Sequence, residues 1–312
     1  MENVLNKLFD SLKLGEARSF KNLTIFPIIS NKPAQSDYQT IDDVLHDNSV
    51  VKIMEVSKKG DVPCLKLINR GGKKVLILDG EELIGAKQDR VASSTLLAPD
   101  NDEIIIPVSC VERNRWNYKS DVFHSENRRA YFRLRKKIFV TSKNNRYRKL
   151  KLHPQHHVWK DIDSKMTNMH VKSPTSSMSD IYKKYLKELG MFSDKIKKDE
   201  GQIGMIAFIN NKPVGCEIFS DPKMLESYYS KVISSYALDA IEESQGASRR
   251  LKTLRKRALS FLNEVRYLQR SEHDSTFGLG MDVILDSDLV HGSALKYNDK
   301  IVYMSLFSKL TQ

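Results

Sequence analysis

Residues 79–90, DGEELIGAKQDR, follow the apolar run VLIL and combine carboxylates, glycines and long cationic side chains in one short stretch. We expect the surrounding segment 73–88 to form a β-hairpin that turns at Asp79 and Gly80, because this pair accepts positive φ. Side chains alternate between the two faces of a strand, so a regular strand here would bury one of two charged sets. A bulge at Gly85 would re-aim the chain and resolve this conflict.

The same stretch supplies candidate functional groups. Glu81 and Glu82 are candidate catalytic residues, because paired carboxylates act as general acids and bases or bind metals. Lys87 and Arg90 carry charges that can hold phosphates. The other candidate ligand-binding residues of the stretch are Asp79, Gly85 and Gln88. The alternative is a hairpin whose charged tip forms a rim salt bridge of little energetic value.

The bulk composition is that of an ordinary globular chain, with 40% hydrophobic and 29% charged residues in 312. No apolar run approaches the roughly 18 residues of a membrane span, and no signal-peptide core follows the amphipathic N-terminus. The three cysteines, Cys64, Cys110 and Cys216, lie far apart, which argues against a disulfide framework or a zinc ribbon. We therefore expect a cytoplasmic protein with no membrane partner.

The net charge of +12 is concentrated in one part of the chain. Residues 113–160, the basic segment, contain fifteen Lys or Arg and two acidic residues, which leaves the rest of the chain near neutral. This pattern favours an anionic partner near the segment, such as nucleic acid, nucleotide phosphates or an acidic protein. The alternative is a solvated basic surface helix.

The sequence pattern predicts an α+β fold of two β-rich halves with antiparallel hairpins. The expected segments are an N-terminal helix (1–18), a β-rich N-terminal half (19–116), a basic helical or irregular insert (117–176) and an α+β C-terminal half (177–312). Together they are expected to form one compact domain.

The N-terminal half has clear local signals. A short helix is expected at 40–48, with Thr40 as its N-cap and Asp43 completing a capping box. The expected strands are 19–30, 49–57, 62–70, 91–99 and 103–111.

The insert should be helical over 126–150 and mostly irregular over 153–177. In the C-terminal half, the clearest helix is 221–244, with Asp221 as N-cap and Pro222 as its first residue. Its expected apolar face, which should pack on the C-terminal sheet, consists of Leu225, Tyr229, Val232, Tyr236 and Ala240. The other expected elements are a capped helix ending at Gly190 (177–190), a hairpin (201–220), a helix near 252–268 and three final strands.

The segment SCVERNRW (109–116) offers further candidates where the chain leaves a strand. Glu112 is a candidate catalytic residue, and Arg115 is a candidate fork for phosphate or carboxylate. Trp116 either stacks on a base or closes one end of the core. Cys110 has apolar neighbours, so we interpret it as a core cysteine rather than a nucleophile.

The loop KSPTSS (172–177) precedes an expected helix. Ser173 and Thr175 are candidate ligand-binding residues, because a helix N-terminus with hydroxyls can hold a phosphate; the alternative is an N-cap loop. The histidines of HPQHH (153–157) lack the ligand set of a zinc site, so no metal is assigned.

The basic segment also interleaves aromatic and cationic residues in RRAYFRLRKKIF. Such a surface can follow a phosphate backbone while its aromatic rings stack on bases, although aromatic residues of helices more often belong to a core. The candidate nucleic-acid-binding residues are Arg128, Arg129, Arg133, Arg135, Lys136, Lys137, Arg146 and Arg148.

The blocks VLILDGEELIGAKQDR, IPVSCVERNRW and SYALDAIEE resemble the ARG and rhodanese-phosphatase-superfamily-associated protein (ARPP) family, a domain of unknown function. The resembling blocks span about residues 19–308. The resemblance implies an association with ADP-ribosylglycohydrolases and rhodanese-phosphatases in bacterial gene neighbourhoods of the defence or nucleotide-conflict kind. It assigns no reaction. Asp89 stands where the family usually has Asn, and the segment 117–152 is unusually long and basic.

Three functions follow as hypotheses. The protein binds or processes a nucleotide or ADP-ribose-like ligand, as the resemblance implies; or it is a non-enzymatic nucleic-acid-binding module that uses the basic segment; or it is an interaction partner for proteins of a linked operon. No cofactor is assigned, and the sequence leaves open whether the protein is an enzyme.

Overall fold

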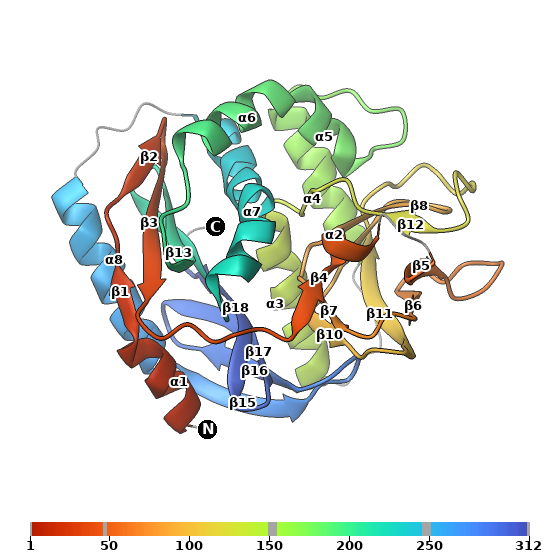
Figure 1. Cartoon of the computed structure of the whole chain (residues 1–312). Helices are drawn as coiled ribbons and strands as arrows, with labels where there is room; N and C mark the ends of the chain where they lie inside the picture. Colours follow the sequence, from red (N-terminus) through yellow and green to blue (C-terminus); the bar gives the residue numbers. More distant parts are fainter. Residues whose placement is uncertain (1, 46–48, 149–154, 245–250, 311–312) are drawn as a thin grey trace. The chain divides into compact units, whose positions relative to one another are not determined.

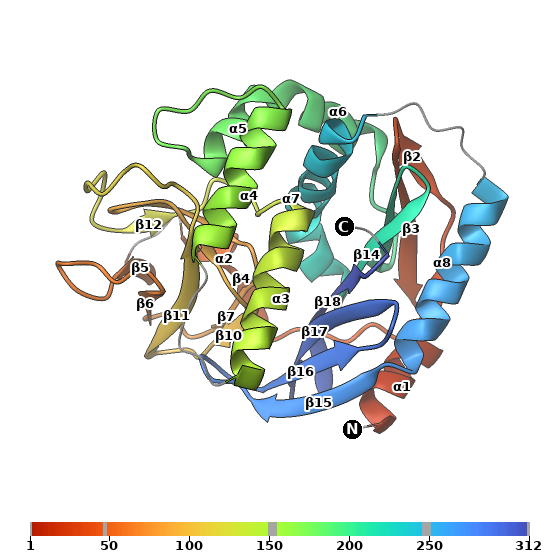
Figure 2. The same cartoon turned by 180° about the vertical axis from the view of Figure 1, so that it is seen from behind.

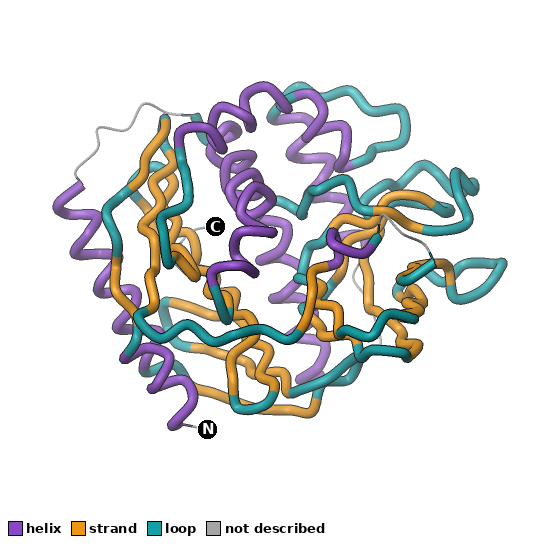
Figure 3. Tube along the Cα trace, viewed as in Figure 1, coloured by secondary structure: helices purple, strands orange, loops and turns teal. Residues whose placement is uncertain are grey.

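The computed structural model describes residues 2–45, 49–148, 155–244 and 251–310 (Figure 1; Figure 2 gives the view from behind). The chain forms two compact units. Unit 1 comprises Met1–Ser36, Gly190–Thr276 and Gly280–Gln312, and unit 2 comprises Asp37–Leu189 and Phe277–Leu279. The fold is α+β, as predicted, with helices and predominantly antiparallel strands (Figure 3). None of the described helices combines the length and apolar character of a membrane span.

The described part of unit 1 contains a nine-stranded sheet. Its strand order is β1-β3-β13-β14-β18-β17-β16-β15, with β2 paired to β3. The strands are β1 (Leu12–Leu14), β2 (Arg18–Phe20), β3 (Leu23–Ser30), β13 (Gln202–Ile209), β14 (Lys212–Phe219), β15 (Gln269–Asp274), β16 (Met281–Asp286), β17 (Val290–Tyr297) and β18 (Lys300–Ser308). Strand β3, expected in the β-rich N-terminal half, therefore pairs with β13 of the C-terminal half.

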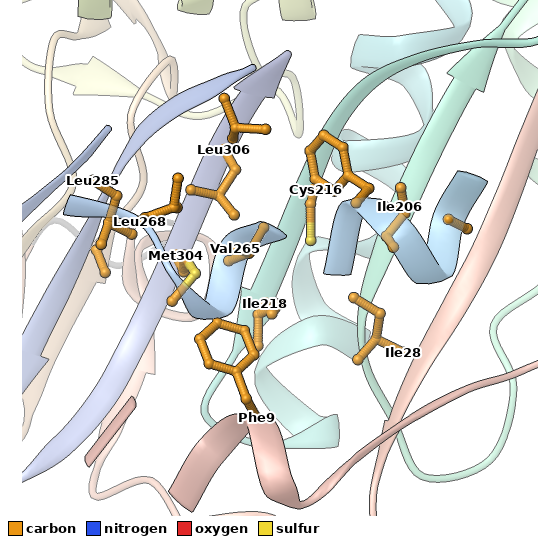
Figure 4. Close-up of a cluster of buried hydrophobic side chains, with 14 of the residues drawn as sticks. Phe9, Ile28, Ile206, Cys216, Ile218, Val265, Leu268, Leu285, Met304 and Leu306 are labelled. Carbon is orange, nitrogen blue, oxygen red and sulfur yellow. The ribbon is translucent and has the colours of Figure 1, made fainter. Parts of the chain in front are cut away.

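The core of unit 1 lies between this sheet and two helices, α1 (Glu2–Asp10) and α8 (Leu251–Arg266). Figure 4 shows Phe9 of α1 and Val265 of α8 among the strand side chains Cys216, Ile218 and Met304. Burial of such apolar surface is the main stabilising contribution to a fold of this size.

The long helix α7 (Pro222–Glu242) begins as predicted. The Asp221 carboxylate accepts hydrogen bonds from the amides of Lys223 (2.8 Å) and Met224 (3.0 Å), which satisfies two otherwise orphaned donors. The helix contacts β13, β14 and β3 of the same unit. The predicted apolar face is only partly right: Tyr229 is half-buried, whereas the neighbouring Tyr228 is fully buried.

Two tight hairpins of unit 1 turn at pairs of residues with positive φ. Asn210 and Asn211 (φ 48° and 64°) join β13 to β14, and Asn298 and Asp299 (φ 47° and 54°) join β17 to β18. Positive φ at both central residues matches the twist of the flanking strands.

Unit 2 contains a three-stranded sheet, β10-β7-β4, and a six-stranded sheet, β12-β8-β9-β11-β6-β5. Only the β4–β7 pair is parallel among the described pairs. The strands are β4 (Tyr38–Thr40), β5 (Val51–Glu55), β6 (Cys64–Asn69), β7 (Lys74–Ile77), β8 (Glu82–Gly85), β9 (Arg90–Ala92), β10 (Leu96–Ala98), β11 (Asp102–Cys110) and β12 (Phe123–His124). The helices are α2 (Ile41–Val44), α3 (Phe132–Arg148), α4 (Gln155–Asn168), α5 (Met178–Lys184) and the start of α6 (Leu186–Lys195). The capping box of α2, with Thr40 and Asp43, is confirmed.

The predicted hairpin over 73–88 is wrong. Strand β7 pairs with β10 and β4, whereas β8 pairs with β9 and β12. Gly80 alone has positive φ (79°) at this corner, so the chain passes from one sheet into another instead of folding back on itself. The true hairpin of the stretch is β8–β9, which encloses residues 86–89.

Several element boundaries also differ from the predictions. The N-terminal helix ends at Asp10 rather than near residue 18, and the predicted strands 19–30 and 91–99 each split in two. Helix α3 begins at Phe132, and the predicted helix 177–190 is divided into α5 and α6, which runs through Gly190. In the described structure the Ser177 side chain makes no capping hydrogen bond.

The largest error concerns residues 155–168, which form helix α4 rather than irregular chain. Strand β15 was not predicted, because its sequence QRSEHD has no apolar alternation. The last three residues of the expected helix 40–48 lie outside the described residues. His153 of the HPQHH segment lies outside them as well.

Candidate functional site

The charged stretch 79–90 is almost entirely buried in unit 2. Glu81, Glu82 and Arg90 are fully buried, and Gln88 and Asp89 are at most 4% exposed. Strict alternation predicts that only one charged set is buried, but members of both sets are buried, and the acids Glu82 and Asp89 pair with Arg128 and Arg115 from later in the chain. Gly85 has φ 132°, and a Cβ there would lie 2.5 Å from Ser120 Oγ and 2.8 Å from the Val122 carbonyl oxygen. The glycine therefore marks a close approach of the 120–123 segment.

Asp89, Glu112 and Arg115 form one buried group, the Arg115 cluster. Arg115 donates from Nε to Glu112 (2.7 Å) and from one terminal nitrogen to Asp89 (2.9 Å). Its remaining N–H groups bind the carbonyl oxygens of Ala86 (2.7 Å), Asn117 (2.8 Å) and Gly85 (3.3 Å). All five N–H donors of a guanidinium group are thereby used, so Arg115 fixes the β8–β9 loop in this structure instead of presenting a fork to a phosphate.

The pKa values of the two carboxyl groups of the Arg115 cluster are shifted in opposite directions. Burial, together with the charge of Glu112, raises the pKa of Asp89 above its ordinary value. Burial also opposes ionisation of Glu112, but hydrogen bonds from Arg115, Thr175 and the Asp89 amide hold the pKa of Glu112 below its ordinary value. One arginine thus serves two buried acids, of which Glu112 keeps its charge more firmly.

Glu82 has a separate arginine. Its Oε2 accepts from Arg128 Nε (2.7 Å) and its Oε1 accepts from Ser179 Oγ (3.0 Å). Burial raises the pKa of Glu82 above its ordinary value against the opposing effect of Arg128. Glu82 is thus enclosed and engaged in the structure, and a substrate would have to displace Arg128 or Ser179 to reach it.

This pKa shift gives a pH prediction for Glu82→Gln. A folded acid with a raised pKa binds more protons than the unfolded chain, so wild-type stability falls as pH rises from the ordinary value of 4.5 through the folded pKa. Because the glutamine of the variant cannot ionise, the free energy of unfolding of wild type minus that of the variant should fall over this range. Urea unfolding at a series of pH values measures it. Glu103→Gln is the control, since the pKa of this exposed acid is lowered; a Glu82→Gln slope equal to wild type would contradict the prediction.

Asp79 is bound by two buried arginines. Its Oδ1 lies 2.7 Å from Arg129 and its Oδ2 lies 3.2 Å from Arg135. Thr95 Oγ1 donates to the same carboxylate at 3.1 Å. A Cβ at Gly80 would lie 2.5 Å from Arg135 Cδ, so the glycine leaves room for the arginine to reach Asp79.

Arg90 lies between Glu55 and Cys110. Its nearest approach to Glu55 is 3.9 Å, and among the described residues neither carboxylate oxygen of Glu55 has a hydrogen-bond partner. Arg90 also binds Gln88 Oε1 (2.9 Å) and faces the ring of Trp116 at 5.6 Å. Burial raises the pKa of the Cys110 thiol to about 11, which keeps it protonated and supports the interpretation of a core cysteine.

Three side chains of unit 2 form a surface, here called the Lys87 surface: the exposed Trp116 and Tyr118 and the half-buried Lys87. The Lys87 ammonium lies 5.3 Å from the Trp116 ring centroid and 5.1 Å from that of Tyr118. Trp116 and Tyr118 are 44% and 49% exposed, so Trp116 does not close the core. Lys87 Nζ donates to the Lys59 carbonyl (2.8 Å), and Gly60 packs on Lys87 and Trp116. The 57–60 turn thus holds the side chains of Lys87 and Trp116 in place.

The loop at 172–177 is occupied by its own hydrogen bonds. Ser173 Oγ donates to Asp180 (2.6 Å) and accepts from the Ser177 amide (2.9 Å). The Thr175 carbonyl accepts from the Asn114 amide (2.9 Å), and its side chain binds Glu112. These contacts are those of an N-cap loop.

Much of the basic segment neutralises acids that lie outside it. Arg129 and Arg135 are buried on Asp79, and Arg128 binds Glu82. Lys137 pairs with Asp161 (2.6 Å), and Arg133 and Lys136 are half-buried. Arg146 and Arg148 lie in the part of α3 whose side chains are outside the described structure. Nucleic-acid binding by this segment stays a prediction, but Arg129 and Arg135 are not on its exposed face.

The sequence analysis did not identify three residues of this region: Glu55, Tyr118 and Lys119, whose ammonium lies 3.8 Å from Glu112. Tyr118 stands two residues after Trp116 and next to Lys119, so the run WNYK was a detectable aromatic and cationic signal. Glu55 ends an ordinary strand pattern, and nothing in the sequence links it to Arg90.

Comparison with known proteins shows which family contains this chain. The family model for the ARG and Rhodanese-Phosphatase-superfamily-associated Protein domain matches residues 11–307. No curated protein and no solved structure matches the chain.

Proposed function

Because the chain belongs to the ARG and Rhodanese-Phosphatase-superfamily-associated Protein family, we propose that it binds an anionic ligand with an aromatic base, of the nucleotide or ADP-ribose class. The observation that supports this is the Lys87 ammonium between the exposed rings of Trp116 and Tyr118. Aromatic faces stack on bases, and ammonium groups attract phosphates. The family's association with ARG and rhodanese-phosphatase proteins supports a role in a bacterial defence or nucleotide-conflict system, in the cytoplasm.

Binding is favoured over catalysis by the burial of the acids. Glu81, Glu82 and Glu112 are at most 1% exposed, and Glu82 and Glu112 are hydrogen-bonded to arginines. A general acid or base must come within hydrogen-bond reach of its substrate. In this arrangement the acids and their arginines hold the backbone beside the Lys87 surface, and the two exposed rings and the Lys87 ammonium contact the ligand.

The test is a titration of the full chain with ADP-ribose, AMP and NAD, in which isothermal titration calorimetry measures the dissociation constant of each ligand. Trp116→Ala should weaken binding by about fivefold or more, since stacking of one base contributes about 1–3 kcal/mol. Lys87→Gln should weaken the binding of ADP-ribose more than the binding of adenosine, titrated beside it as a control ligand, because only ADP-ribose carries phosphates.

Tyr267→Ala is the matched control, because Tyr267 is an exposed aromatic residue of unit 1 (80% exposed). Equal affinity of wild type and Trp116→Ala, or no binding of any of the three ligands, would refute the proposal. Tighter binding of a single-stranded oligonucleotide, falling steeply with salt, would instead support the nucleic-acid hypothesis.

A further inference from the structure

Unit 1 contains a cavity of about 500 Å³ that is independent of the Lys87 surface in unit 2. It is lined by α1, by the segment that follows β3, and by the β17–β18 turn together with Ile203 and Ser220. Its volume is within the range of about 300–1,000 Å³ that is typical of small-molecule sites.

Part of the lining is apolar and is here called the floor of the cavity. It includes Leu8 of α1, Ile301, which is 6% exposed, and the fully buried Ile203. The hydroxyls of Ser11 and Ser30 lie 3.0 Å apart, and Ser11 also donates to the Leu8 carbonyl (2.7 Å). Since these hydroxyls already have partners, the floor offers contact mostly to an apolar group.

The rim of the cavity is cationic. Lys7, Lys32 and Lys300 come from three separate segments, and all three are exposed. Within the described residues, none of these ammonium groups forms an ion pair.

Each of the two acids of the lining lies near another cation. Asp10 lies 2.8 Å from Arg266, and the exposed Asp299 lies 3.8 Å from Lys296, and neither of these cations lines the cavity. The lining therefore carries three lysines against two acids, and this excess of positive charge attracts an anion from solvent.

We propose that this cavity binds an amphiphilic organic anion, with an apolar chain on the floor and a carboxylate or phosphate group at Lys7, Lys32 and Lys300. Charge complementarity selects the head group, because three lysines from separate segments outnumber the two acids of the lining. The apolar floor selects against fully polar anions, whose groups would lose water without gaining partners.

Isothermal titration calorimetry of the full chain tests the proposal with octanoate and octyl phosphate, and with octylammonium as the oppositely charged analogue. At least one of the two anions should bind with saturation, and octylammonium should not. The two anions distinguish a carboxylate from a phosphate head group. The triple variant Lys7→Gln/Lys32→Gln/Lys300→Gln should weaken binding of the anion by about tenfold, from three surface charge interactions.

Lys13→Gln/Lys223→Gln/Lys256→Gln is the matched control, because it removes the same charge from exposed lysines of unit 1 that do not line the cavity. It should bind as wild type does. Failure of both anions to bind wild type, binding of octylammonium with equal affinity, or unchanged affinity of the rim variant would each overturn the proposal. The proposed function is tested with different ligands and with variants of the Lys87 surface. A negative result in one experiment therefore does not affect the result of the other.

Discussion

Arg115→Met should lower the free energy of unfolding at neutral pH by about 3–5 kcal/mol, the usual effect of leaving a buried charge without its partner. Arg115 is 7% exposed and contacts both Asp89 and Glu112. Methionine fills a similar volume but offers no donor, so two buried carboxylates and the carbonyl oxygens of the β8–β9 loop lose their hydrogen bonds. Chemical denaturation of wild type and variant measures the difference.

Two comparisons separate the loss of charge pairing from simple repacking. Arg113→Met removes a half-exposed arginine that pairs with Asp163 at 2.6 Å, and should cost at most about 1 kcal/mol. Adding Asp89→Asn and Glu112→Gln to Arg115→Met removes the unpaired charges, so this triple variant should be more stable than the single one. A triple variant less stable than Arg115→Met would contradict the explanation.

The pH dependence of Arg115→Met has a defined sign. Without the arginine, burial raises the pKa of both carboxyl groups above their unfolded values, so the folded variant takes up protons as pH falls. Its stability deficit relative to wild type should therefore shrink as the pH falls below neutral. A deficit that is constant with pH would show that lost packing, rather than unpaired charge, destabilises the variant.

Local signals in the sequence were sufficient wherever a residue acts on its own neighbours. Asp221 caps α7 through the next amides, and Asn210 and Asn211 adopt the two positive φ values that close their hairpin. These interactions span only a few residues, so the pattern contains both partners. The helix α4 had such a signal as well: Val158, Ile162 and Met166 recur at helical spacing and are buried, but the histidines and flanking prolines drew the prediction towards irregular chain.

Strand partners and buried counter-charges could not be derived in the same way. The segment VLILDGEELIG contains β7 and β8 in order, yet each pairs in a different sheet. The local pattern assigns Asp79 and Glu82 to an exposed tip, because their partners, Arg129 and Arg128, come about fifty residues later. A charge count over the basic segment records the arginines but not the acids that they neutralise, and so overstates the free positive charge.

Gly85→Ala should destabilise the protein by about 3 kcal/mol, although it adds a single methyl group. The φ of 132° at Gly85 is one that residues with a side chain rarely adopt, which costs about 1–3 kcal/mol. The new Cβ would also lie 2.5 Å from Ser120 Oγ and 2.8 Å from the Val122 carbonyl oxygen. Neither atom can move freely, because Ser120 Oγ bridges the Ala86 amide (3.1 Å) and that same carbonyl (2.7 Å). Urea unfolding of the variant beside wild type gives the cost.

Gly72→Ala is the matched control in unit 2, since among the described residues no heavy atom lies within 4 Å of its added Cβ. It should change stability by no more than about 0.5 kcal/mol. Adding Ser120→Ala to Gly85→Ala removes one of the two clashes and should recover only part of the loss, because the Val122 carbonyl and the unfavourable φ remain. If the double variant regained the stability of wild type, the contact with Ser120 alone would explain the need for glycine at position 85. If it regained only part, the backbone conformation at Gly85 would also require glycine. The same backbone conformation would then help to place Lys87 beside Trp116.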